Sequence, residues 1–151
     1  AVIKAYLLRY ARIHRIDPLK EVISVSLNTQ TKEPAYLLGR LFAVLEKAQA
    51  DASGGYNKLN ATIKDRYFGA ASASPASVFP LLLRLSQHHI AKSDYGRFRD
   101  MEIQEIMSGL ERFPAHLNLN EQGLFVLGYY HQKEEYFKKK DNEQEKGDSQ
   151  S

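Results

Sequence analysis

Residues 34–49 of the chain read PAYLLGRLFAVLEKAQ, and this stretch decides the fold class. Its apolar residues recur at the three- and four-residue spacing of an α-helix: Leu37, Leu38, Leu41, Phe42, Val44, Leu45 and Ala48. Pro34 stands at a position where the first turn of a helix tolerates proline. The spacing therefore predicts a helix from Pro34 to about Ala50, with a broad apolar face that has to pack against other helices.

Further segments on both sides of this stretch show the same helical spacing. Apolar residues fall three and four apart in residues 2–16, 59–71 and 95–110. Asp17-Pro18 ends the first of these, because the residue before a proline disfavours the helical conformation. Glycines 54 and 55 lie between two of the helical segments and predict a flexible loop over residues 51–57.

Two more helices carry recognisable start signals. Ser74 supplies a capping hydroxyl and Pro75 occupies the first helical position, so a helix should begin there and continue past Ile90. Asn118 or Asn120 can cap a last helix, with an acidic residue in its first turn, that leads toward Phe137.

Two segments depart from this pattern. Residues 22–27 alternate between apolar and polar side chains and form one possible short β segment. Residues 138–151 consist of Lys, Asp, Glu, Gln, Asn, Gly and Ser and predict a disordered polar tail. We therefore expect a mainly α fold, a bundle of about five to six helices in a single domain over residues 1–137, followed by that tail.

Composition excludes several classes of protein. The chain has 151 residues, 43% of them hydrophobic, which is enough to form a core. It has no cysteine, which excludes disulfides, thiolate metal sites and a cysteine nucleophile. No apolar run approaches the roughly 20 residues that span a bilayer. We expect a soluble, cytoplasmic protein without membrane contact.

Positive charge is concentrated in the first two thirds of the chain. Residues 1–100 contain 15 Lys and Arg against 8 Asp and Glu, whereas residues 101–151 contain 6 against 10. This asymmetry favours a polyanionic partner for the front part of the chain.

Motifs that would support catalysis are missing from the sequence. The five histidines have no partner at a metal-binding spacing such as His-Glu-x-x-His, and His88 and His89 diverge by about 100° on a helix. No Gly-x-Ser-x-Gly elbow is present, and no Walker sequence follows the paired glycines. We expect no enzyme activity, no metal and no cofactor.

Basic residues instead recur in pairs on separate predicted helices, on the sides away from the apolar stripes. The candidates for nucleic-acid contact are Arg9, Arg12, Arg40, Lys47, Lys64, Arg66, Arg84 and Lys92. Ammonium and guanidinium groups presented in this way reach phosphates and release counterions without reading bases. A solvated helix face is the ordinary alternative for each of them.

Three stretches resemble one family. Residues 34–49, residues 61–75 (ATIKDRYFGAASASP) and residues 113–132 (FPAHLNLNEQGLFVLGYYHQ) are similar, in order, to the carboxy-terminal region of the large subunit of the type I-C CRISPR Cascade. In that family this helical region is also produced as a separate small subunit. The resemblance implies a small subunit of this kind rather than the whole large subunit.

The resemblance also implies the partners. Such a subunit packs against the backbone and large Cascade subunits around the CRISPR RNA, assembles with further copies of itself, and helps to hold target DNA, as displaced strand or hybrid backbone, in the R-loop. It carries no catalytic residues, because a separate nuclease-helicase cleaves the DNA. Among the candidates, the matching segments contain Arg40, Lys47, Lys64 and Arg66.

Two other interpretations remain open from the sequence. The chain can be an assembly scaffold that bridges the backbone and large subunits without touching nucleic acid. It can also be the carboxy-terminal domain of the large subunit rather than an independent product.

Overall fold

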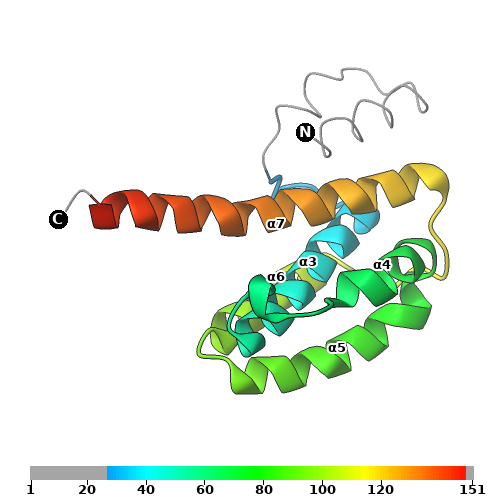
Figure 1. Ribbon diagram of the computed structural model, residues 1–151. Coiled ribbons are helices and arrows are strands. Elements are labelled where there is room, and N and C mark those ends of the chain that lie inside the picture. The colour runs from blue at the N-terminus through cyan, green and yellow to red at the C-terminus, as the bar shows by residue number, and fades with distance from the viewer. Residues whose placement is uncertain (1–26, 149–151) are drawn as a thin grey trace.

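The computed structural model describes residues 27–148, which form a mainly α fold without a strand in that range (Figure 1). Its elements are α3 (Pro34–Ser53), the short 3₁₀ helix η1 (Tyr56–Lys58), α4 (Ile63–Ala73), α5 (Pro75–Lys92), α6 (Gly96–Ser108) and α7 (Leu119–Asp148). The predicted helical bundle is therefore confirmed. The helix expected over residues 2–16 and all but Leu27 of the possible β segment lie outside the described residues.

Helix α3 is the centre of the bundle. Every residue from Ala35 to Glu46 is buried, including both charged ones. Helices α4, α5, α6 and α7 all pack against it, whereas α5 and α7 lie farther apart and meet through the rings of Phe79 and Phe125. Figure 1 accordingly shows α3 between α7 on one side and α5 on the other. A helix surrounded in this way is apolar around most of its circumference.

Aromatic rings fill the space around the middle of α3. Phe42 is fully buried, and its ring meets four others edge-on at centroid distances of 5.5–6.4 Å: Phe68, Phe79, Phe125 and Tyr129. Edge-to-face pairs at this distance are favourable beyond the area that they bury. One side chain of α3 thus joins α4, α5 and α7 into one core.

Helices α3 and α7 approach closely because each has a glycine where they cross. A Cβ atom on Gly39 would collide with the carbonyl oxygen of Phe125, and one on Gly128 would collide with that of Tyr36. Both glycines sit within helices, where glycine costs roughly 1 kcal/mol relative to alanine. The close backbone contact between α3 and α7 offsets that cost.

Capping residues set the helix ends. Helix α4 begins at Ile63, four residues later than predicted, because Thr62 and Asp65 form a capping box. Asn118 is confirmed as a cap of α7, and it exchanges hydrogen bonds with Glu121 at 2.9 and 3.0 Å. Helix α3 continues into the predicted loop and ends at Ser53, where Gly54 caps it with a φ of 89° that suits glycine.

Helix α5 begins at Pro75 as predicted, but its first turn is held from elsewhere. The Ser74 side chain makes no capping hydrogen bond. Instead the Ala76 N–H donates to the carbonyl of Pro114 at 3.0 Å, and Leu117 N–H donates to Ala73 at 3.0 Å. These bonds tie the start of α5 to the loop before α7.

The polar segment after Phe137 differs from the expected tail. Helix α7 continues through residues 138–148, and the side chains of 138–147 are exposed. Lysine, glutamate and glutamine are good helix formers, so local propensity extends the helix beyond its packed part. In Figure 1 this end of α7 projects past the other helices. None of the described helices has the length and apolar character needed to cross a membrane.

The glycine crossing yields a stability prediction. Gly128→Ala should lower the free energy of unfolding by about 3 kcal/mol, because the added methyl group forces α3 and α7 apart. Urea unfolding followed by circular dichroism measures this change. Gly69→Ala is the matched control: a Cβ at this position of α4 meets nothing within 4 Å, so stability should rise by up to about 1 kcal/mol. Equal effects of the two substitutions would contradict the close crossing.

Candidate nucleic-acid interface

The outer side of α5 is a cationic surface. Arg84, His88 and Lys92 recur every fourth residue, and all three are exposed. Helix α5 contains no Asp or Glu, and no ion pair holds Arg84 or Lys92 within residues 27–148. These two side chains are therefore available to an anionic ligand. We call Arg84, His88, Lys92 and the adjoining Arg66 the α5 cationic face.

Arg66 joins this face from α4 across a recess between the two helices. The recess has a volume of about 370 Å³, and we call it the α4/α5 recess. Its lining consists of Gln49, Ala61, Thr62, Ile63, Arg66, Tyr67, Leu85 and His89. Arg66 is exposed and makes no ion pair with a described carboxylate. The structure thus brings Arg66 next to the helix that carries Arg84 and Lys92.

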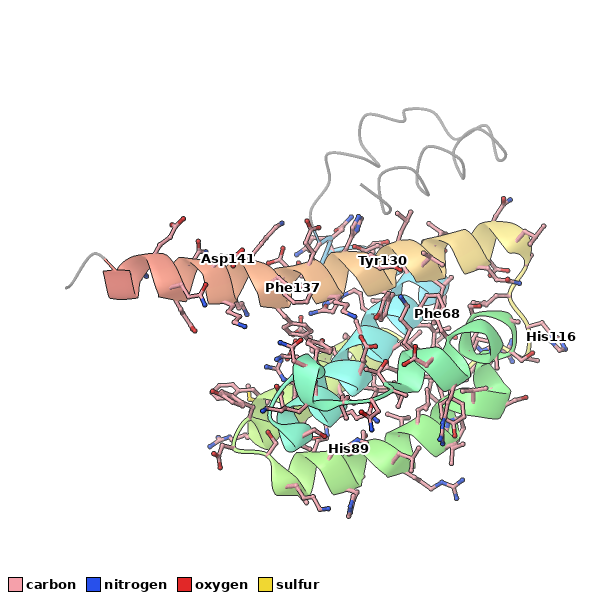
Figure 2. The ribbon with its side chains drawn as sticks, viewed as in Figure 1. Phe68, His89, His116, Tyr130, Phe137 and Asp141 are labelled. Carbon is pink, nitrogen blue, oxygen red and sulfur yellow. The ribbon has the colours of Figure 1, made fainter. Side chains whose placement is uncertain are left out.

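The two adjacent histidines of α5 have different surroundings. His88 is exposed, whereas His89 is partly buried at the recess, as their divergence on a helix predicted. Burial lowers the pKa of His89, and the nearby His88 and Lys92 lower it further. The His89 imidazole is consequently neutral at neutral pH, so one ring nitrogen donates and the other accepts a hydrogen bond. Figure 2 shows His89 on α5, on the far side of α3 from Phe137 and Asp141 of α7.

Two leucines interrupt the polar surface of α5. Leu81 is 36% exposed and Leu85 is 39% exposed, although both are large apolar residues of this helix. Packing against α3, α4 and α6 buries Pro75, Val78, Phe79, Leu82 and Ser86 of this helix. Helix α5 thus has more apolar surface than the bundle covers.

Arg40 and Lys47 of α3 point to partners within the protein. Arg40 is 5% exposed, and its Nε donates to Gln132 Oε1 of α7 at 3.1 Å. Lys47 forms an ion pair with Asp51 at 2.9 Å, and its Nζ lies 5.5 Å from the centre of the Tyr56 ring. Arg40 thus pairs across to α7 and Lys47 pairs within α3, so neither side chain forms part of the α5 cationic face.

Lys64 also has partners within the protein, and two other candidates fall outside the range that the structure describes. The Lys64 Nζ donates to the Tyr130 hydroxyl at 3.0 Å and lies 5.1 Å from the centre of that ring. Cation–π contacts of this kind fix the ammonium group against α7. Arg9 and Arg12 lie outside the described residues. Of the eight sequence candidates, the structure therefore groups three, Arg66, Arg84 and Lys92.

The buried carboxylate of Glu46 binds polar and charged side chains that were not among the candidates from the sequence. Glu46 is 1% exposed, and it accepts hydrogen bonds from Tyr129 at 2.6 Å, Thr62 at 2.7 Å and Lys133 at 2.9 Å. Burial and the Glu46 charge together raise the pKa of Tyr129, which keeps its hydroxyl protonated as a donor. This network joins α3, α7 and the cap of α4.

The sequence did contain a signal for this network. Glu46 interrupts the predicted apolar face of residues 34–49, and a buried carboxylate requires a cation or several donors. The partner Lys133 is 87 positions away, so the pairing itself was not visible. Arg99 forms similar pairs, with Asp51 at 2.8 Å and with Glu102.

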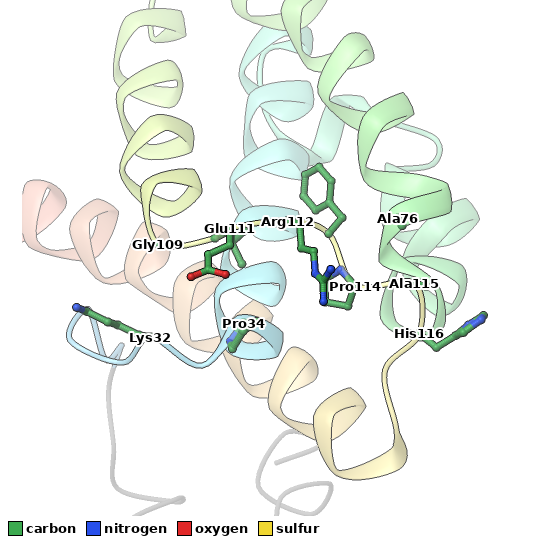
Figure 3. A pocket seen from close by; sticks show the side chains of 11 residues that line it. Lys32, Pro34, Ala76, Gly109, Glu111, Arg112, Pro114, Ala115 and His116 are labelled. Carbon is green, nitrogen blue, oxygen red and sulfur yellow. The ribbon is translucent and has the colours of Figure 1, made fainter.

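A second hollow lies at the start of α3 and α5 (Figure 3). It measures about 870 Å³ and is lined by the loop from Gly109 to His116 together with Lys32, Pro34 and Ala76. Its charges have both signs, because Glu111 neighbours Arg112. In Figure 3 Lys32 and His116 lie at opposite sides of the hollow. Its charged side chains therefore do not converge on one point. Among residues 27–148, no group of three or more His, Asp or Glu is placed to hold a metal ion.

Comparison with protein families agrees with the resemblance of the three segments. A family model described as "CRISPR-associated protein (Cas_Csd1)" matches residues 1–137. The match covers all three segments and every candidate residue of the sequence analysis. Comparison with curated proteins gave no match.

The Glu46 network predicts a stability effect. Tyr129→Phe keeps the ring contacts but removes a hydroxyl bonded to a buried charge, so the free energy of unfolding should fall by about 2 kcal/mol. Urea unfolding measures the change. Tyr95→Phe serves as control, because Tyr95 is 57% exposed and its hydroxyl has no partner among the described residues. A Tyr129→Phe protein as stable as the control would show that the hydroxyl does not support Glu46.

Proposed function

The chain belongs to the CRISPR-associated Cas_Csd1 family of type I-C Cascade, and from that membership we propose that it is a non-catalytic small subunit that holds the backbone of target DNA in the R-loop. The observation that carries this proposal is the α5 cationic face. Arg84 and Lys92 share one side of α5, and Arg66 lines the recess between α4 and α5. All three are exposed and have no carboxylate partner among the described residues.

Electrostatics describes how such a face acts. Lysine and arginine neutralise phosphates and release condensed counterions, which favours binding without reading sequence. R-loop formation exchanges one set of base pairs for another of nearly equal stability, so contacts to the backbone are able to tip the balance. Further copies of the chain would repeat the face along the strand, while the guide RNA supplies sequence recognition.

A rigid support is part of this mechanism. Helix α5 is anchored through Phe79 and Leu82, which are 0% and 1% exposed, while Arg84 and Lys92 stay outside. The phosphate-binding groups are thus carried on a packed helix, and only their flexible side chains lose freedom when a strand binds. Less conformational entropy is lost than if the backbone had to order as well.

The scaffold interpretation is also supported by an observation. Tyr95, Phe98 and Met101 of the α6 region are 57%, 62% and 60% exposed and follow one another at helical spacing. Exposed aromatic and methionine side chains are typical of protein interfaces. We propose that this stripe contacts another subunit of the complex while the α5 cationic face holds nucleic acid.

The nucleic-acid role is tested in the assembled complex. Arg84→Glu combined with Lys92→Glu should weaken retention of target DNA at about 0.15 M salt by roughly tenfold. The slope of the logarithm of the affinity against the logarithm of the salt concentration should also decrease, by the equivalent of about two phosphate contacts. Gel-shift titration of the complex at several salt concentrations measures both. Complex assembly and the thermal stability of the chain should stay nearly unchanged, because both side chains are exposed and unpaired.

A matched control carries the same change in charge elsewhere. Lys140→Glu with Lys146→Glu alters two exposed lysines on the projecting end of α7. This double variant should retain DNA like the unaltered complex. Equal retention by both double variants would reject the α5 cationic face, and failed assembly of the α5 variant before DNA is added would favour the scaffold role.

A further inference from the structure

The α4/α5 recess contains polar groups that the fold leaves unused. Arg66, Tyr67 and His89 line it, and none of them has a hydrogen-bonding partner among the described residues. The side-chain oxygen of Gln49, Oε1, accepts a hydrogen bond from the Ile63 N–H at 2.9 Å. No described group accepts one from the NH₂ of the same side-chain amide. A phosphate site needs donors alone. This recess instead offers donors together with groups that donate and accept, namely a tyrosine hydroxyl and a neutral imidazole.

Apolar surface accompanies these polar groups. Ile63 and Ala61 line the recess, and Leu85 at its edge is 39% exposed. Leu81, one turn earlier on α5, adds further exposed apolar surface. Contact with phosphates alone does not explain leucines in the middle of the α5 cationic face. A ligand with a flat apolar face and a polar edge would satisfy both kinds of group.

We propose that the α4/α5 recess receives an unpaired nucleobase of the strand whose phosphates lie on Arg84 and Lys92. A volume of about 370 Å³ lies at the small end of the range for ligand sites, roughly 300–1,000 Å³, which suits a single base better than a larger ligand. The proposal rests on the proposed function and specifies its ligand as a single strand. Bases inside a duplex are stacked and paired, so only a single-stranded stretch presents one to the recess at no cost of unstacking.

Arg66 connects the two parts of this site. It lines the recess and is exposed, so its guanidinium is able to meet a phosphate next to the inserted base. The site thereby combines a backbone contact that is sensitive to salt with a base contact that is not. No base-specific reading is required, because every base has an apolar face and a polar edge.

The test compares two oligonucleotides that share a backbone and differ in bases. The full chain is titrated, in low salt, into fluorescein-labelled oligothymidylate and into an abasic oligonucleotide of the same length. Fluorescence anisotropy gives both affinities. We expect oligothymidylate to bind roughly tenfold more tightly, as one well-placed base contact provides. The same oligothymidylate annealed to its complement should bind more weakly than the single strand.

Two substitutions test whether the preference for the strand with bases arises in the α4/α5 recess. Ala61→Trp fills the recess without changing charge and should abolish the preference for bases, while the affinity for the abasic strand stays the same. Ala115→Trp is the matched control, because Ala115 is exposed in the loop before α7, outside the α5 cationic face, and does not line the recess. It should leave both affinities unchanged, and circular dichroism verifies that both variants fold.

Each possible result either supports or overturns the proposed base site. Equal affinity of the unaltered chain for the two oligonucleotides would overturn the base site and leave backbone binding intact. Binding to neither strand would overturn the proposed function together with this inference. A duplex bound at least as tightly as the single strand, or an Ala61→Trp chain that loses affinity for both strands alike, would also overturn insertion of a base. A preference removed by Ala61→Trp alone would support it.

Discussion

Helix α3 is enclosed by four other helices, and this enclosure decides which charges the protein offers to a ligand. A charged side chain inside a bundle must be paired there, because desolvation without a partner costs several kcal/mol. Glu46 therefore gathers Lys133, Tyr129 and Thr62 around itself, and Arg40 turns to Gln132. Charges on α3 are paired inside the protein, whereas Arg66, Arg84 and Lys92 on the outer layer have no carboxylate partner among the described residues.

Helix α5 is placed differently. It packs against α3, α4 and α6 along one side only, and it has no acidic residue to neutralise its cations. Basic residues with the same helical spacing thus have different roles, according to the layer that carries them. Lys64, which lies only two positions before the free Arg66, is held over aromatic rings of the core. Layer position, rather than charge pattern, separates candidate ligand contacts from structural ion pairs.

Much of the fold was predictable from local signals. The apolar spacing around Phe42, the proline at the start of α5 and the cap at Asn118 are properties of neighbouring residues, and the structure confirms each. The continuation of α7 past Phe137 was not expected, because a low apolar content predicted disorder while helix propensity acts in the opposite direction.

The candidate site was predictable only in part, for the same reason. Helical phase indicated that Arg84 and Lys92 share a side, and the structure agrees because that side faces no other described helix. Phase did not reveal that Gln132 reaches Arg40, or that Tyr130 reaches Lys64, because these partners are 92 and 66 positions away. The exposure of Leu85 was also not predictable, because a sequence does not show whether the neighbouring helices cover the whole of an apolar stripe or only part of it.

That surplus of apolar surface bears on how the proposed backbone-binding subunit would act at cellular salt. The contribution of counterion release to affinity falls steeply as salt rises, and three free cations provide few phosphate contacts. A contact between an apolar surface and a base has no such dependence, and it adds to the hold on a strand once its bases are unpaired. A face that combines both, as proposed here, would favour the separated strand over the closed duplex. In an exchange as nearly balanced as R-loop formation, a small preference repeated over successive subunits would be sufficient to keep the strands apart.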